Sequence, residues 1–277
     1  MTRIARKAFG DFDITVMRDG GLEFGNEVFP ALAEERISAI LAESGKRAIE
    51  TNFNAVLLRS PDSCILIDAG AREHFGPGAG QFPQAMAEAG LSAHDVETLV
   101  ITHLHPDHIG GTTNPDNSAV FPNAEFVLTE AEYNFWTADG NFTNVDDAKL
   151  QWRNIALAVL EAYSDRIRTV ASNGPIAPGV TFSDLPGHTP GHAGVLLDSG
   201  GARFLHAADI LHAPDLQLFD PDIGAVFDMD KEEAIRSRRR GLDMIADDRM
   251  LFTGSHFLNC QLGYLETSGR GYRISQD

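Results

Sequence analysis

ITHLHPDHIGG, residues 101–111, holds three histidines and an aspartate within six positions, between an apolar run and two glycines. The VETLVIT segment that overlaps its start is predicted to be a buried strand leading directly into the histidines. Side chains alternate between the two faces of a strand, so we expect His103 and His105 to point the same way. Pro106 has no N–H to donate, and it is expected to end this strand.

The residues after the proline are expected to turn back toward the same place. Gly110 and Gly111 allow a tight turn, so Asp107 and His108 can reach a point beside the first two histidines. The segment then offers two ligands to each of two metal ions about 3.5–4 Å apart, which is the usual spacing of a two-metal site. A histidine-rich surface loop is the alternative, and the order H-x-H-x-D-H after an apolar strand disfavours it.

A two-metal site needs more ligands than one loop holds, and three later loops offer them. His188 in LPGHTPGH, Asp209 in HAADILH and His256 in FTGSHF each follow a predicted strand, where a rigid sheet can hold a ligand in place. One carboxylate can bind two metals through its two oxygens, and Asp209 suits that role. The candidate metal ligands are His103, His105, Asp107, His108, His188, Asp209 and His256.

Composition limits the class of protein. The chain has 277 residues, 43% hydrophobic content and a net charge of −18. This charge disfavours nucleic acid and anionic membranes as partners. We find no signal sequence and no apolar run long enough to span a membrane, so a cytoplasmic location is expected. The two cysteines, Cys64 and Cys260, cannot form a disulfide framework.

The order of predicted elements indicates a two-sheet protein. Helices are expected at 82–91, in 130–165 and at 230–248, with an extra helical segment in 30–50 whose purpose the sequence does not reveal. Strands are expected at 12–20, 54–60, 64–70, 96–102, 124–129, 179–187, 193–200, 202–209 and 249–255. We expect α+β architecture, with two sheets packed face to face and helices outside. Residues 1–277 are expected to form one domain, with helical insertions near 30–50 and 130–165.

The order of these motifs resembles the metallo-β-lactamase superfamily over nearly the whole chain. THLHPDHIGG is the most specific match, and DAG at 68–70, PGHTPGH, AADILH and GSHF follow in the family's order. FGPGAG, FPNAEFVLTEAEYNFW and GRGYRI are most similar to the methyl parathion hydrolase branch. The resemblance implies a four-layer αββα sandwich with the active site at one edge.

The resemblance also implies how the ligands are divided between the metals. One metal would be held by His103, His105 and His188, and the other by Asp107, His108 and His256. Asp209 would bind both. Asp68 would support a ligand rather than bind metal itself.

The predicted reaction is metal-assisted hydrolysis. Two divalent ions leave a locally positive site inside an acidic protein. Zinc lowers the pKa of bound water to about 7, so a hydroxide that bridges the metals can attack a carbonyl or phosphoryl centre. Asp107 is expected to orient this nucleophile and take part in catalysis. Zinc is the expected metal, and iron, cobalt and manganese also suit histidine and carboxylate ligands.

The expected substrate is small, neutral and partly apolar, because aromatic residues lie in segments that the resemblance places near the site. A lactone, including acyl homoserine lactones, or an aryl ester fits best. His212, three residues after Asp209, can contact the substrate or protonate a leaving group, although a solvated loop histidine is an equal alternative. The candidate substrate-binding residues are Phe75, Phe135, Trp136 and Trp152.

Several other functions remain open on the same scaffold. The first is a methyl parathion-type hydrolase of organophosphate triesters. A glyoxalase II-like thioesterase would normally carry a helical C-terminal extension, but only some 20 residues follow His256. An iron dioxygenase would use fewer ligands, a diiron protein would replace His105 with an acid, and a binding protein would have lost ligands. A homodimer is one assembly that the sequence leaves open.

Overall fold

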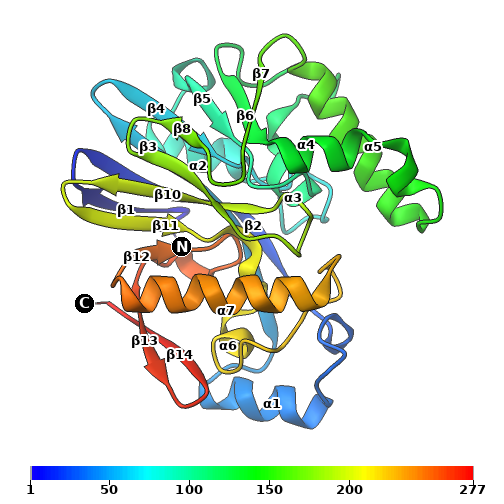
Figure 1. The fold of residues 1–277 in the computed structure, drawn as a ribbon, viewed down its shortest axis with the longest axis vertical. Helices are drawn as coiled ribbons and strands as arrows, with labels where there is room; N and C mark the ends of the chain where they lie inside the picture. The colour runs from blue at the N-terminus through cyan, green and yellow to red at the C-terminus, as the bar shows by residue number, and fades with distance from the viewer. Residues whose placement is uncertain (1, 277) are drawn as a thin grey trace.

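A seven-stranded sheet forms the first half of the protein in a computed structural model that describes residues 2–276 (Figure 1). Its strands pair in chain order, antiparallel from β1 to β4 and parallel from β4 to β7. They are β1 (Ile4–Phe9), β2 (Phe12–Phe24), β3 (Ile49–Ser60), β4 (Ser63–Ile67), β5 (Thr98–Val100), β6 (Glu125–Thr129) and β7 (Ile167–Val170).

A five-stranded sheet, in the order β12-β11-β10-β9-β8, forms the second half. The long helix α7 connects its parallel pair, β11 and β12. A separate hairpin, β13–β14, closes the described chain. These strands are β8 (Pro175–Ala177), β9 (Val180–Asp184), β10 (Ala193–Ser199), β11 (Ala202–His206), β12 (Leu251–Thr253), β13 (Tyr264–Ser268) and β14 (Gly271–Ser275).

Helices cover the outer face of each sheet (Figure 1). The α-helices are α1 (Glu34–Glu43), α2 (Phe82–Ala89), α3 (Pro106–Ile109), α4 (Glu130–Thr137), α5 (Asp147–Ala162), α6 (Pro214–Gln217) and α7 (Lys231–Asp247). Short 3₁₀ turns are η1 (Asn26–Val28), η2 (Ala93–Asp95), η3 (Gly110–Thr112), η4 (Asp139–Phe142), η5 (Ala208–Ile210) and η6 (Leu258–Cys260).

Three apolar clusters hold four layers together. The first joins the seven-stranded sheet to α2, α4 and α5. The second fills the space between the two sheets, where Val56 and Val127 of one sheet meet Val195 and Phe204 of the other. The third joins the five-stranded sheet to α7. The expected αββα sandwich is therefore confirmed, since each sheet buries one face on its partner and one on helices.

The chain before the histidines differs from the expectation. Strand β5 ends at Val100, and His103 and His105 lie in the loop that follows rather than on alternating positions of a strand. Pro106 does not end a strand but begins helix α3, where a missing N–H costs nothing because first-turn amides have no partner within the helix. The carboxylate of Asp68 accepts the Thr102 N–H at 3.0 Å and so draws the chain away from the sheet.

The segment near 30–50, whose role the sequence did not reveal, contains α1. Its apolar face, with Ile37, Ile40 and Leu41, packs with Ala213 and Leu216 in a fourth cluster, beside the loop that carries His212. The second predicted insertion, 130–165, contains α4 and α5. None of the helices in residues 2–276 is both long and apolar enough to cross a membrane.

Candidate metal centre

The seven candidate ligands meet at one edge of the sandwich. Four of them follow β5, and the other three lie in the loops after β9, β11 and β12. Six are buried, and Asp107 is half-buried. Side chains that are far apart in the sequence therefore share one site because strands of both sheets end there.

Three ring nitrogens form a tight triangle, which we call the imidazole group. His103 Nε2 lies 3.1 Å from both His105 Nδ1 and His188 Nε2, and the last two atoms are 2.9 Å apart. Tetrahedral zinc with Zn–N bonds of about 2.0–2.1 Å separates its nitrogens by roughly 3.3 Å. The observed triangle is close to that size.

A second set of side chains, Asp107, His108, Asp209 and His256, forms what we call the mixed group. His256 Nε2 lies 2.8 Å from Asp209 Oδ2, and His108 Nε2 lies 3.2 Å from Asp209 Oδ1. Asp107 Oδ2 is 3.5 Å from His108 Nε2 and 3.8 Å from His256 Nε2. Two imidazoles and two carboxylates thus face one another.

Asp209 lies between the two groups. Its Oδ2 is 3.5 Å from His188 Nε2 and 3.8 Å from His103 Nε2, while both of its oxygens also face the mixed group. Strand β11 ends three residues before it, and the short turn η5 carries it. Asp209 is therefore the one carboxylate of the seven that faces both sets of ligands, as its predicted shared role requires.

The residues present fit a pair of metal ions. Within residues 2–276, the buried mixed-group atoms His108 Nε2 and Asp209 Oδ1 make no hydrogen bond, although they lie 3.2 Å apart. Such atoms are costly unless something binds them. Burial, reinforced by neighbouring imidazoles, lowers the pKa of His103 and His105 well below the ordinary value, so these rings are neutral as metal ligands must be.

The charges of the mixed group also fit a bound cation. Burial alone would lower the pKa of His108, but the carboxylates of Asp209 and Asp107 raise it well above its usual value. Burial would likewise raise the pKa of Asp209, yet His108 and His256 hold it well below its usual range. Two buried carboxylates therefore favour positive charge at this point, which a divalent cation supplies.

A second layer of groups orients the ligands. Asp68, whose backbone φ is 58°, accepts hydrogen bonds from Thr102 Oγ1 and His108 Nδ1, both at 2.8 Å. This contact agrees with the expected supporting role. His192 accepts the backbone N–H of Asp209 through Nε2 at 3.0 Å and contacts the Leu185 carbonyl through Nδ1.

Two further supports were not recognised in the sequence. The Asn52 carbonyl lies 2.9 Å from His256 Nδ1. Asp228 Oδ1 lies 3.2 Å from His188 Nδ1, and Asp228 Oδ2 accepts from the fully buried Arg238. Nothing in the local pattern around Asp228 marks it, because it lies 40 residues from the histidine that it orients.

An aromatic wall encloses the ligands. The cavity beside them is lined by Phe24, Phe53, Phe75, Trp152 and Phe227, together with ligand side chains and His212. Its free space is about 30 Å³, room for about two water molecules. Phe75 and Trp152 were expected here, whereas Phe24 in β2, Phe53 in β3 and the loop residue Phe227 were missed because no motif surrounds them.

The other two aromatic residues expected in the wall lie elsewhere. Trp136 is buried behind His105, with the ring centroids 5.7 Å apart, and its Nε1 donates to Glu132. Phe135 packs against Trp136 and Phe142. Neither lines the cavity, because α4 turns their side chains into the core beneath the imidazole group.

His212 lines the cavity rather than extending into solvent. It is buried, stacks on His256 at 5.1 Å between ring centroids, and its Nε2 is 3.6 Å from Asp209 Oδ2. Gln217 of α6 fixes its backbone by accepting the His212 N–H. Neither ring nitrogen has a hydrogen-bond partner among the described residues, so both can bind a ligand. Burial, reinforced by His188, lowers its pKa well below the usual value and keeps the ring neutral.

Comparison with known proteins now identifies the family. The model of the metallo-beta-lactamase superfamily matches residues 50–256. This chain belongs to that superfamily. The solved structure of AidC, a dizinc quorum-quenching lactonase in complex with an acyl-homoserine product, superposes with a TM-score of 0.91 at 26% identity. The match covers 99% of this chain and 97% of the AidC chain.

Curated superfamily members match over shorter stretches. A probable metallo-hydrolase of Mycobacterium tuberculosis is 29% identical over 181 residues, covering 57% of this chain and 56% of the relative. An N-acyl homoserine lactonase, AttM, of Rhizobium radiobacter is 30% identical over 115 residues, covering 39% and 38%. This chain therefore spans about half the length or less of these two relatives.

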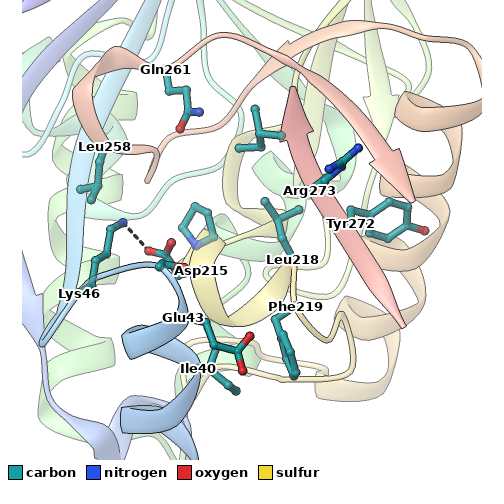
Figure 2. Close-up of a pocket in the computed structure, with 13 residues that line it drawn as sticks. Ile40, Glu43, Lys46, Asp215, Leu218, Phe219, Leu258, Gln261, Tyr272 and Arg273 are labelled. Atoms are coloured by element: carbon teal, nitrogen blue, oxygen red, sulfur yellow. Dashed lines mark hydrogen bonds and ion pairs between the residues drawn. The ribbon is translucent and has the colours of Figure 1, made fainter. Parts of the chain in front are cut away.

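This superfamily member also has a larger hollow elsewhere. It measures about 320 Å³ and lies between α1, α6, the segment after η6 and β14 (Figure 2). Figure 2 shows an ion pair between Lys46 and Asp215 at one side, and Leu218, Tyr272 and Arg273 at the other. Among the described residues that line it there is no histidine. The hollow therefore lacks the imidazole donors found at the sandwich edge.

Proposed function

We propose that this protein is a metal-dependent hydrolase that opens neutral, partly apolar lactones. The observation that carries the proposal is the convergence of the imidazole and mixed groups on Asp209 beneath an aromatic wall. The superposition on a dizinc lactonase over 99% of the chain supports it. When bound, two divalent cations supply the positive charge that polarises a carbonyl oxygen and makes water a nucleophile near neutral pH.

The ligands would be divided as the structure groups them. The imidazole group would hold one ion and the mixed group the other, with Asp209 facing both. Zinc is the metal that we propose, because three imidazoles form a set that suits it. Two metals, rather than one, are supported by two sets of donors within residues 2–276 that share no residue; a third set, His188, His212 and Asp228, overlaps the imidazole group at His188.

Two side chains are placed to handle protons and the substrate. Asp107 lines the cavity and is half-buried, so its carboxylate can accept the proton that the attacking water loses. His212 is buried and neutral, it lines the cavity with Nε2 at 3.6 Å from Asp209 Oδ2, and its ring can donate one N–H to the substrate. We assign it hydrogen bonding to a lactone oxygen rather than the role of a charged acid.

The wall sets the substrate class. Five aromatic rings favour an apolar body, and the net charge of −18 disfavours polyanions approaching the site. The free space of about 30 Å³ is far below the 300–1,000 Å³ typical of a ligand site. The enclosed space beside the ligands can therefore hold only a small part of a substrate.

The test is a hydrolysis screen of zinc-loaded protein against acyl homoserine lactones, simple lactones, aryl esters and phosphotriesters. We expect the acyl lactones to give the highest kcat/KM, and Asp107→Asn to reduce all activities together. Rapid phosphotriester hydrolysis without lactone opening would contradict the proposal and favour the methyl parathion-type alternative. No hydrolysis of any of these esters by protein that holds two zinc ions would refute the hydrolase itself.

A further inference from the structure

Glu132 is a buried acid that the proposed reaction does not use. It lies in the first turn of α4, and its side chain is completely shielded from solvent. No lysine, arginine or histidine forms an ion pair with it within residues 2–276. An isolated buried carboxylate is expensive, so the contacts that it makes indicate why the fold retains it.

Both carboxylate oxygens are fully used by hydrogen-bond donors. Oε1 accepts the Leu104 N–H at 2.9 Å and the Trp136 Nε1–H at 2.7 Å. Oε2 accepts the Thr189 hydroxyl at 2.5 Å and the Gly191 N–H at 3.1 Å. Four donors can stabilise a buried negative charge in place of a cation.

These contacts reach both loops that carry the imidazole group. Leu104 lies between His103 and His105, and Thr189 directly follows His188. Trp136, whose Nε1–H donates to Oε1, packs edge-on against His105, with 89° between the ring planes. None of the four hydrogen bonds comes from the loop that carries Asp209 or from the loop that carries His256.

The backbone around α4 makes the same connection. Thr129, the N-cap residue of α4, accepts the Glu132 N–H and donates its hydroxyl to the Gly191 carbonyl at 2.7 Å. A Cβ on Gly191 would lie 2.0 Å from the Glu132 nitrogen, so only glycine permits this approach. The helix start and the His188 loop are therefore fixed against each other.

The mixed group has a counterpart of its own. Asp68 accepts hydrogen bonds from the backbone and hydroxyl of Thr102 and contacts His108 Nδ1. The candidate ligand that Asp68 contacts directly is His108 of the mixed group, while Thr102 Oγ1 also lies 3.1 Å from His103 Nδ1. Each buried acid thus lies behind one set of ligands, with Glu132 behind the imidazole group and Asp68 behind the mixed group.

We propose that Glu132 is a positioning residue for the metal held by the imidazole group, fixing His103, His105 and His188 through four hydrogen bonds and placing its carboxylate behind the three rings. The inference rests on the two-metal site of the proposed function. Outer groups of this kind typically change metal affinity by 10–100-fold.

The test measures zinc binding by chelator competition in folded Glu132→Gln, with Asp68→Asn as the matched variant. The glutamine keeps the shape but sets an NH₂ group against the Gly191 N–H. We expect one zinc ion to bind about 10–100-fold more weakly and the other to be unchanged. Anomalous diffraction at the zinc edge should show that Glu132→Gln loses the ion at the imidazole group, whereas Asp68→Asn weakens the ion at the mixed group.

Equal weakening of both ions in Glu132→Gln, or none, would overturn the assignment. If that variant does not fold, Thr189→Val and Trp136→Phe each remove one donor and should weaken the same ion by a smaller factor; unchanged affinity in both would refute it. If the wild-type protein binds two zinc ions but opens no lactone, the proposed substrate is wrong. The role of Glu132 is still tested by the zinc affinity of its variants. Fewer than two ions in the wild type overturns both proposals.

Discussion

The imidazole group and the mixed group lie side by side and share Asp209, yet they differ in charge and in support. The first consists of three rings whose mutual distances are 2.9–3.1 Å, with a carboxylate, Glu132, one layer behind. The second has carboxylates among its own ligands, with Asp68 behind it. One site thus offers two chemically distinct places for a cation.

This difference shows how a single edge can hold two ions of like charge. Asp209 faces both places, so its negative charge screens the repulsion between the cations. Histidine binds metal through a neutral imidazole, so the imidazole group adds donors without further charge. The predictions below test this division, beginning with the change that affects both groups.

Replacing the shared carboxylate should have the largest effect. In Asp209→Ala each ion loses a ligand, so we expect at least one zinc ion to be released. Activity should fall more than about 100-fold, because changes to outer groups alone cost 10–100-fold. Inductively coupled plasma mass spectrometry measures the metal content, and kcat/KM measures the loss of activity. Two ions retained at full occupancy would exclude the bridging role.

Loading with two different metals should reveal the chemical difference directly. Imidazole ligands suit zinc, whereas carboxylates suit manganese. With one equivalent of each metal, we expect zinc at the imidazole group and manganese at the mixed group. Anomalous diffraction at both absorption edges locates each metal. A random mixture at both places would mean that the groups do not differ in selectivity.

The aromatic wall has one side near the imidazole group and another near the mixed group. Truncating one ring should show what its side contributes to substrate binding. Trp152 lies 4.9 Å from His105 of the imidazole group, whereas Phe53, which contacts Phe75, lies 6.0 Å from His256 of the mixed group. We expect Trp152→Ala to lower kcat/KM for long-chain acyl lactones by about tenfold, or about 1–2 kcal/mol, with a smaller effect on short lactones.

Phe219→Ala is the matched control for this experiment. Phe219 lines the separate hollow near α6 and is 37% exposed, so its removal should leave every lactone rate unchanged. Phe75→Ala tests the other side of the wall. A loss in Trp152→Ala that does not depend on chain length would show that the ring supports His105 instead of contacting the acyl chain.

The smallest expected effect concerns His212, which stacks on a ligand of one group and lies 4.7 Å from the ring of His188 in the other. We expect His212→Ala to slow lactone opening severalfold to tenfold through loss of one hydrogen bond. Activated aryl esters should change less, because their leaving groups need little assistance. Zinc content should remain at two ions. Equal losses for both substrates would argue against contact with the lactone oxygen.

Much of the metal centre was predictable because its information is local. The spacing of His103, His105, Asp107 and His108 is a property of a six-residue stretch. The other ligands each followed a strand signal, so their position at a sheet edge could be inferred. The αββα arrangement followed from strand and helix periodicity. That the whole chain is one domain stays a prediction.

The error over the histidine loop has a physical cause. Apolar periodicity continues through Ile101, so the sequence predicts a longer strand. The strand instead ends at Val100, because Asp68 on the neighbouring chain segment captures the Thr102 N–H. A tertiary hydrogen bond therefore overrode the local pattern, and Pro106 became the first residue of α3.

The sequence by itself was enough to select the candidate ligands, since histidine and carboxylate donors at this spacing have few other uses. Tertiary structure alone decided what surrounds them. Glu132 looks like its neighbour Glu130 in the sequence, and Asp228 resembles any acid in a loop. Only folding buries Glu132 against the loops that carry the ligands and places Asp228 against His188. Trp136 and Trp152 likewise differ only in direction, one facing the core and one the cavity. Burial and partners depend on segments far apart in the chain, and a local pattern cannot encode which of two similar side chains will meet them.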